Sequence, residues 1–96
     1  MITHVVLAKL KDQSAHNMES THALLRSMIG KIPSLRDFEA GTDVTRSERS
    51  YDIALIAKFD DLTGLKEYLK HPVHVPVSDK LRELAASILT VDYESS

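Results

Sequence analysis

Apolar residues at the start of the chain follow a strand-like pattern. Residues 2–10 (ITHVVLAKL) are rich in β-branched and aliphatic side chains, which is typical of a β-strand. Because side chains alternate between the two faces of a strand, the polar His4 falls on the same face as Val6 and Ala8.

A first helix is expected from Ser14, a favoured N-cap residue, to about Ile29. Gly30 ends this helix, and Pro33 prevents its resumption. The apolar residues that recur at helical spacing on one stripe are Met18, Leu25 and Ile29. His22 lies on the same stripe.

Two further strands are expected at residues 34–44 and 51–59, with a polar loop between them. The second is apolar on both faces in its middle, which predicts a central place in a sheet. Asp60 or Asp61 then caps a helix that breaks at His71, because a residue before proline is disfavoured in the α conformation. The residues of this helix expected to face the core are Leu62, Leu65 and Leu69.

The end of the chain predicts one more helix and one more strand. Ser78 and Asp79 start the helix DKLRELAASI, and residues 89–94 form the last strand, with apolar Leu89, Val91 and Tyr93 alternating with polar neighbours. The order βαββαβ, with an extra short helix before the final strand, predicts one domain over residues 1–96. Its fold class is α+β, ferredoxin-like, with a four-stranded antiparallel sheet and helices on one face. The uncovered apolar sheet face predicts a homodimer, sheet against sheet, forming a dimeric α/β barrel.

Composition narrows the classes of function. The chain of 96 residues has 43% hydrophobic and 27% charged residues, which is typical of a globular protein. A net charge of −2 without clustered Lys and Arg argues against nucleic acid and against an anionic membrane surface as partners. RNA-recognition domains share the βαββαβ order, but strand 51–59 carries aromatics only at its ends, Tyr51 and Phe59. The absence of cysteine excludes disulfides and thiolate chemistry and is compatible with the cytoplasm.

Several segments in order resemble the stress-responsive α/β-barrel domain (Dabb) family. They are HVVLAKLK (4–11), KIPSL (31–35), EAGTDV (39–44), YDIALIAKF (51–59), YLKHPVH (68–74) and DY (92–93). The resemblance implies a ferredoxin-like protomer, a homodimer, a cavity between sheet and helices, and for some members a link to stress. The segment YLKHPVH (68–74) is similar to the matching segment of plant polyketide cyclases in the family. In those enzymes a tyrosine and the second histidine of HPxH act together. The matching residues here are Tyr68 and His74.

Two readings of this segment stay open. In the catalytic reading, His74 is a general base and Tyr68 donates a hydrogen bond to a developing enolate, with no metal or cofactor. In the other reading, the histidines hydrogen-bond backbone groups where two helices meet, and Tyr68 packs in the core. The function expected first is the binding of a small, largely apolar ligand without turnover. The alternative is a cofactor-independent cyclase or isomerase.

Other residues are expected to line the ligand cavity, with Val77, Ala85 and Leu25 supplying an aliphatic wall. The expected ligand-binding residues are His4, Val6, His22, Leu25, Leu55, His71 and Val77. A metal site at the HPVH pair is disfavoured, because two histidines supply only two of the three or four ligands that zinc requires. No metal is therefore predicted.

Overall fold

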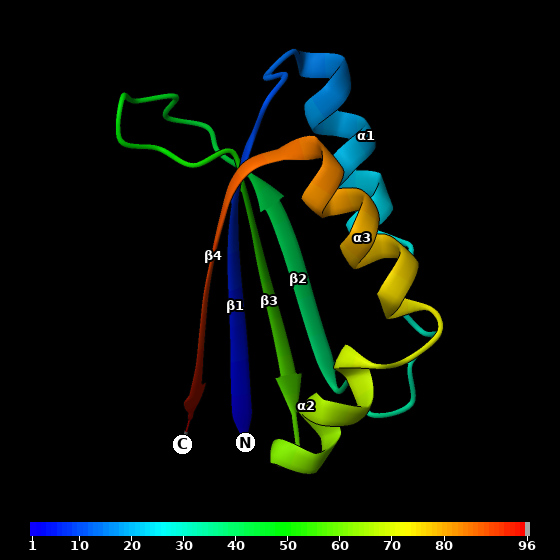
Figure 1. Cartoon of the computed structure of the whole chain (residues 1–96). Helices are drawn as coiled ribbons and strands as arrows, with labels where there is room; N and C mark the ends of the chain where they lie inside the picture. The colour runs from blue at the N-terminus through cyan, green and yellow to red at the C-terminus, as the bar shows by residue number, and fades with distance from the viewer. Residues whose placement is uncertain (96) are drawn as a thin grey trace.

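The computed structural model describes residues 1–95 and contains a four-stranded antiparallel sheet with all its helices on one face (Figure 1). The strands lie in the order β2-β3-β1-β4. In chain order the elements are β1 (Ile2–Leu10), α1 (Ala15–Arg26), β2 (Asp37–Thr42), β3 (Ile53–Phe59), α2 (Leu62–Leu69), α3 (His74–Leu84) and β4 (Ala85–Glu94). The predicted ferredoxin-like α+β fold is confirmed, and β3 is central as expected.

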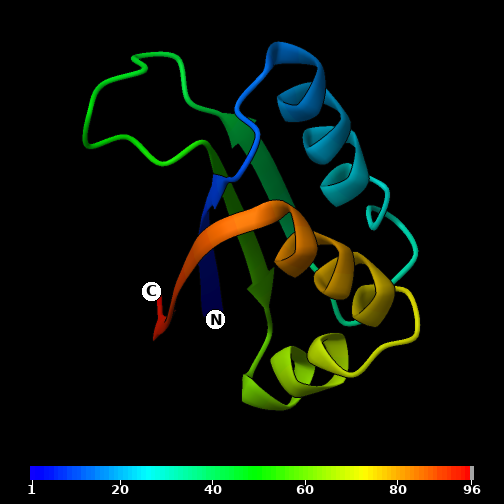
Figure 2. The same ribbon diagram turned by 45° about the horizontal axis from the view of Figure 1, so that its top comes forward.

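The register of the sheet places the polar residues of β1 and β4 beside one another. His4 pairs with Ala57 of β3 on one side and with Asp92 of β4 on the other. Val6 pairs in the same way with Leu55 and Thr90. The side chains that face the helices include those of His4, Val6, Leu55 and Thr90. The helices lie together on one side of the sheet (Figure 2).

Local capping explains where two of the helices begin. The Ser14 hydroxyl accepts a hydrogen bond from the Asn17 backbone N–H at 3.2 Å, and Asp61 accepts one from the Gly64 N–H at 2.9 Å. Asp61, rather than Asp60, is therefore the cap of α2. Gly64 also packs closely against Phe59: a Cβ added to Gly64 would lie 3.4 Å from the Phe59 Cβ.

The predicted end of the first helix is wrong by one turn. α1 ends at Arg26, and the backbone then tightens, with Met28 N–H bonded to the Leu25 carbonyl and Ile29 N–H to the Arg26 carbonyl. Three residues per turn bring Met28 under Leu25, so Met28 is buried while Ile29 is 44% exposed. Gly30 follows with a φ of 79°, a conformation that favours glycine.

The largest error concerns the last helix and strand. α3 begins at His74 rather than at Ser78 or Asp79, because Pro76 falls in its first turn, where a backbone N–H has no helical partner to lose. α3 also ends earlier than expected, at Leu84. The segment from Ala85 onward pairs with β1, and these sheet hydrogen bonds override the helical preference of the two alanines.

The core-facing residues of α2 also differ from the expectation. Leu65 is buried as predicted, but Leu62 and Leu69 are 52% and 43% exposed, and Tyr68 is buried instead. A helix of only eight residues presents one short stripe, and Leu65 and Tyr68 occupy it. The predicted strands at 34–44 and 51–59 are shorter in the structure, at Asp37–Thr42 and Ile53–Phe59.

One buried carboxylate organises the end of the sheet away from the termini. Asp52 is fully buried and accepts hydrogen bonds from the Leu10 N–H (2.7 Å), Gln13 (3.1 Å) and Arg46 (2.7 Å). Burial alone would raise the pKa of Asp52, but these three donors outweigh it and hold the pKa below its ordinary value. Asp52 thereby ties the β1–α1 turn to the loop before β3.

Candidate functional site

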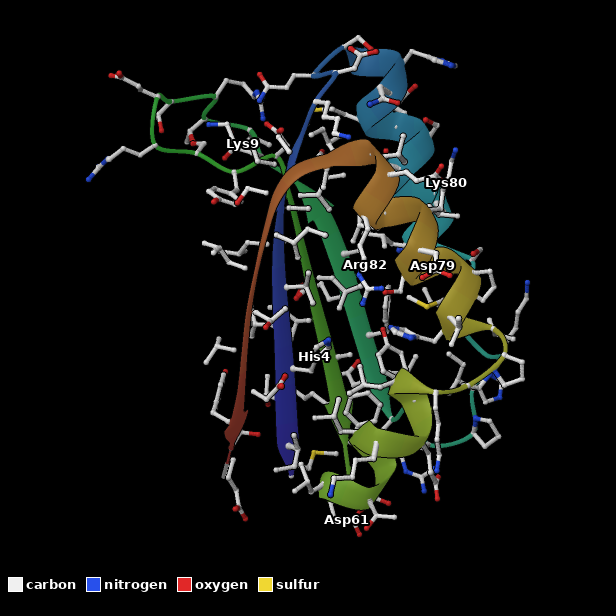
Figure 3. The ribbon with its side chains drawn as sticks, viewed as in Figure 1. His4, Lys9, Asp61, Asp79, Lys80 and Arg82 are labelled. Carbon is white, nitrogen blue, oxygen red and sulfur yellow. The ribbon has the colours of Figure 1, made fainter. Side chains whose placement is uncertain are left out.

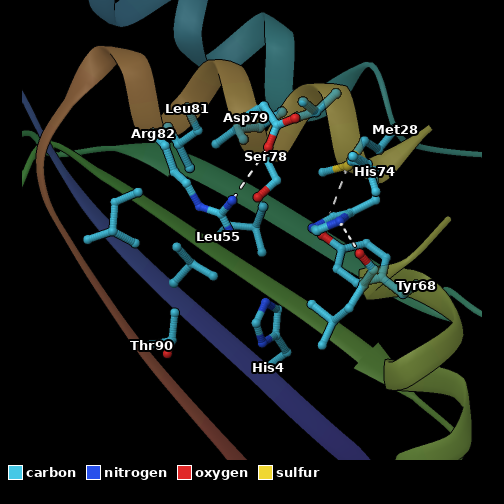
Figure 4. A pocket seen from close by; sticks show the side chains of 16 residues that line it. His4, Met28, Leu55, Tyr68, His74, Ser78, Asp79, Leu81, Arg82 and Thr90 are labelled. Carbon is cyan, nitrogen blue, oxygen red and sulfur yellow. Dashed lines mark hydrogen bonds and ion pairs between the residues drawn. The ribbon is translucent and has the colours of Figure 1, made fainter. Parts of the chain in front are cut away.

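A cavity of about 370 Å³ lies between the helix-facing side of the sheet and the helices (Figure 4). Most of its wall is aliphatic. The apolar residues in this wall include Val6, Leu25, Leu55, Val77, Leu81 and Ile88. The polar residues are fewer: His4, Tyr68, His74, Ser78, Asp79, Arg82 and Thr90. Such a cavity suits a small, mainly apolar molecule with a few polar atoms.

Tyr68 and His74 meet inside this cavity although six residues separate them in the chain. α2 ends at Leu69, the chain turns at Pro72, and His74 is the first residue of α3. The turn returns the His74 ring to within 4.3 Å of the Tyr68 ring, measured between centroids. The bend at Pro72 therefore produces the convergence that the sequence resemblance implies.

The orientation of His74 is set by a backbone carbonyl. Its Nδ1–H donates a hydrogen bond of 3.0 Å to the carbonyl oxygen of Leu69. In a neutral imidazole only one nitrogen carries hydrogen, so Nε2 is left with a free lone pair. Partial burial lowers the pKa of His74 below its ordinary value. Electrostatic interaction with His4 and Arg82 lowers this pKa further, and the Leu69 hydrogen bond and Asp79 oppose the change. His74 is therefore neutral at pH 7 and can accept a proton at Nε2.

Tyr68 presents a protonated hydroxyl. Its ring packs against Phe59, with 5.0 Å between centroids, and against His4 at 5.9 Å. Burial raises the pKa of Tyr68 well above its ordinary value, so the phenol keeps its proton. Its described partner is the sulfur of Met28 at 4.0 Å, and a thioether is a weak acceptor. The hydroxyl is thus available to donate to a better acceptor, such as a carbonyl or enolate oxygen.

His4 is held by a carboxylate. Its Nδ1–H donates to Asp92 of the neighbouring strand β4, and the His4 side chain is buried while that of Asp92 is 42% exposed. The carboxylate fixes the orientation of the ring and favours hydrogen on Nδ1, because a carboxylate can only accept. The sequence singled out His4 for its unusual place in an apolar strand, but its partner Asp92 was not foreseen as part of the site.

Two histidines that were expected to line the cavity have other contacts. His22 donates from Nε2 to the Ala40 carbonyl of β2 at 2.8 Å. His71 accepts the Val73 N–H at 3.0 Å, which is the helix-junction role weighed for this segment. Neither residue is part of the cavity wall, whereas His4, Val6, Leu25, Leu55 and Val77 are. Among residues 1–95, no group of three or more His, Cys, Asp or Glu side chains is arranged to hold a metal ion.

Four polar residues of the wall were not predicted as site residues: Ser78, Asp79, Arg82 and Thr90. Ser78 and Arg82 follow His74 at intervals of four residues, so all three share one face of α3. That signal is present in the sequence but becomes visible only if the helix begins at His74. Thr90 belongs to the same face of β4 as Asp92 and was read only as a polar spacer.

The depressed pKa of His74 predicts a pH-dependent stability. Because the folded state binds this proton less readily than the unfolded state, the contribution of His74 is fully present above about pH 6.5 and is lost as pH falls through the lower folded pKa. We expect the urea midpoint to fall between pH 7 and pH 5, and to fall less in His74→Gln. Identical pH dependence in the two proteins would contradict the assignment.

The chain is similar in sequence and fold to several known proteins. Olivetolic acid cyclase of Cannabis sativa is 26% identical over 95 residues, spanning 96% of this chain and 94% of that protein. A dimeric ferredoxin-like protein of unknown function from Bacteroides fragilis is 33% identical, with a TM-score of 0.84 over 98% of this chain and 95% of that one. The hydroxynitrile lyase of Passiflora edulis has a TM-score of 0.84 at 15% identity, covering 99% and 93% of the two chains, and shares the fold.

No helix in the described residues is long and apolar enough to cross a membrane. Residues 2–95, nearly the whole chain, match the model of the Stress responsive A/B Barrel Domain family. The chain therefore belongs to the Dabb family.

Proposed function

We propose that this protein binds a small, largely apolar carbonyl compound in the cavity and catalyses proton transfer beside the carbonyl group without metal or cofactor. The observation that carries the proposal is the pairing of a neutral His74, whose Nε2 is free, with a protonated Tyr68 hydroxyl beside it. Base and hydrogen-bond donor are the two groups that enolisation requires.

In the proposed reaction, His74 Nε2 removes a proton from a carbon flanked by two carbonyl groups. The electron pair moves to the carbonyl oxygen, where the Tyr68 hydroxyl donates a hydrogen bond to the enolate. When the substrate carries a further carbonyl in the same chain, the enolate carbon attacks it and a C–C bond forms. The new alkoxide then takes the proton from the His74 imidazolium, which completes an intramolecular aldol addition. A relative named as a cyclase supports this class of chemistry.

A second candidate function is binding without turnover. The aliphatic wall favours it, because most of the cavity offers hydrophobic contact rather than reacting groups. Both functions use the same cavity, so they differ only in whether Tyr68 and His74 act on the bound molecule.

We further propose that the protein is a homodimer formed through the helix-free face of the sheet. β4 leaves Leu89, Val91 and Tyr93 about half exposed on that face, at 51%, 54% and 50%. Next to them on β1 lie Leu7 and Val5, which pair with Leu89 and Val91. A contiguous apolar surface of this kind is typical of an interface. The Bacteroides fragilis relative is described as dimeric, which supports a dimeric state.

The catalytic proposal predicts a loss of turnover in two variants. With linear tri- and tetraketones as substrates, His74→Gln should lower the rate of cyclisation by about 100- to 10,000-fold. Tyr68→Phe should lower it by about 100- to 1,000-fold, because the enolate loses one donor. Product formation is followed by chromatography, and binding by calorimetry on the same samples.

His16→Gln is the matched control, since His16 is an exposed histidine on α1. Saturable binding by the wild type with no product would leave the binding function and reject the enzyme. Turnover that survives in His74→Gln would reject the assigned base.

The dimer proposal predicts a mass of about twice the 10.7 kDa chain mass in sedimentation at micromolar concentration. Val91→Asp should yield a monomer, because a charge would be buried at the centre of the apolar face. Val44→Asp introduces the same charge at a residue that is 89% exposed in a loop and should leave the dimer intact. A monomeric wild type would show that the sheet face does not mediate self-association.

A further inference from the structure

The cavity wall carries a permanent positive charge, Arg82, that makes no direct contact in the proposed proton transfer. Arg82 lies on α3, on the same face as His74 and Ser78, and its side chain extends over the cavity beside Ser78 (Figure 4). On the same helix, Lys80 points away from the sheet (Figure 3). Arg82 is therefore the cation that this helix offers to a bound molecule.

Most of the hydrogen-bonding capacity of Arg82 is uncommitted within residues 1–95. Its described bond is one contact from Nη1 to Asp79 at 3.4 Å, between side chains that are 71% and 65% exposed. Exposed pairs of this kind are weak, and a guanidinium has five N–H donors arranged to match a carboxylate. A carboxylate of a ligand can therefore take the place of Asp79 or share the guanidinium with it.

The spacing along α3 sets the length of such a ligand. Arg82 follows His74 by eight residues, which is about 12 Å along a helix axis. The side chain of Arg82 is longer than that of His74 and its guanidinium lies beside Ser78 (Figure 4), which shortens the distance between the guanidinium and the imidazole. Thr90 on β4 lines the cavity on the same side as Arg82, whereas Tyr68 and His74 lie together on the other side (Figure 4).

We infer that the substrate is an anionic keto compound whose carboxylate binds Arg82 while its ketone, several carbons away, lies at Tyr68 and His74. The inference rests on the proposed function for the position of the ketone and adds the recognition of the charged end. Two carboxylates lie near the cavity: Asp92 is hydrogen-bonded to His4, and Asp79 makes the single long contact with Arg82 that a ligand carboxylate replaces or shares.

Calorimetry with a matched pair of probes, 5-oxooctanoate and its methyl ester, tests this inference. Both are monoketones, so binding is measured without turnover. The wild type should bind the acid about tenfold more tightly than the ester, and Arg82→Gln should abolish that preference by weakening the acid alone. Arg82→Lys should restore part of it, since lysine keeps the charge but not the fork of donors.

Lys80→Gln is the control, because it removes the same charge from the same helix on the side away from the cavity, and it should retain the preference. Equal affinity of the wild type for acid and ester, failure to bind the acid, or an equal loss in Arg82→Gln and Lys80→Gln would overturn the inference. Cyclisation that depends on His74 while acid and ester bind alike would reject the carboxylate site and leave the proposed function intact. If the preference for the acid depends on Arg82 but the linear tri- and tetraketones are not cyclised, the carboxylate site is supported and the proposed catalytic function is rejected.

Discussion

The hydrogen bond between His74 Nδ1–H and the Leu69 carbonyl is the interaction on which the site depends. It joins the last residue of α2 to the first residue of α3 across the bend at Pro72. It also determines which nitrogen of the imidazole carries hydrogen and holds the ring against Tyr68. Without it, the imidazole could rotate away from the cavity, and the free lone pair at Nε2 would not be aimed at a bound molecule.

Because side chains alternate along each strand, one sheet supplies residues both to the cavity wall and to the face that carries no helix. On β1, His4 and Val6 face the cavity, while Val5 and Leu7 face the side of the sheet that carries no helix. A one-residue slip of this strand would exchange the two sets and destroy both surfaces. The polar His4 on an otherwise apolar face thus marks the cavity side of the sheet.

Much of the fold could be predicted from the residues, because strand alternation and helix caps are local signals. The order of elements, the central place of β3 and the face of His4 all follow from them. The pairing of Tyr68 with His74 came from the family resemblance, and the geometry of the bend supports it. Arg82 and Ser78 could not be recognised, because the last helix was expected to start only at Ser78 or Asp79. Once the helix begins at His74, all three residues fall on one stripe.

Other failures reflect tertiary contacts that a local pattern does not contain. Ala85 and its neighbours have helical propensity but complete the sheet beside β1. Met28 replaces Ile29 in the core because the helix tightens after Arg26. Asp92 bonds to His4 only because β4 pairs with β1 in one particular register. His22 faces the edge strand β2 because its Nε2 donates a hydrogen bond to the Ala40 carbonyl there.

The most direct test of this account is a nitrogen-detected NMR measurement of the His74 tautomer at neutral pH. The account predicts a neutral ring with hydrogen on Nδ1 and an unprotonated Nε2. A ring protonated on Nε2 alone, or an imidazolium at pH 7, would contradict it, because neither form leaves a base aimed into the cavity.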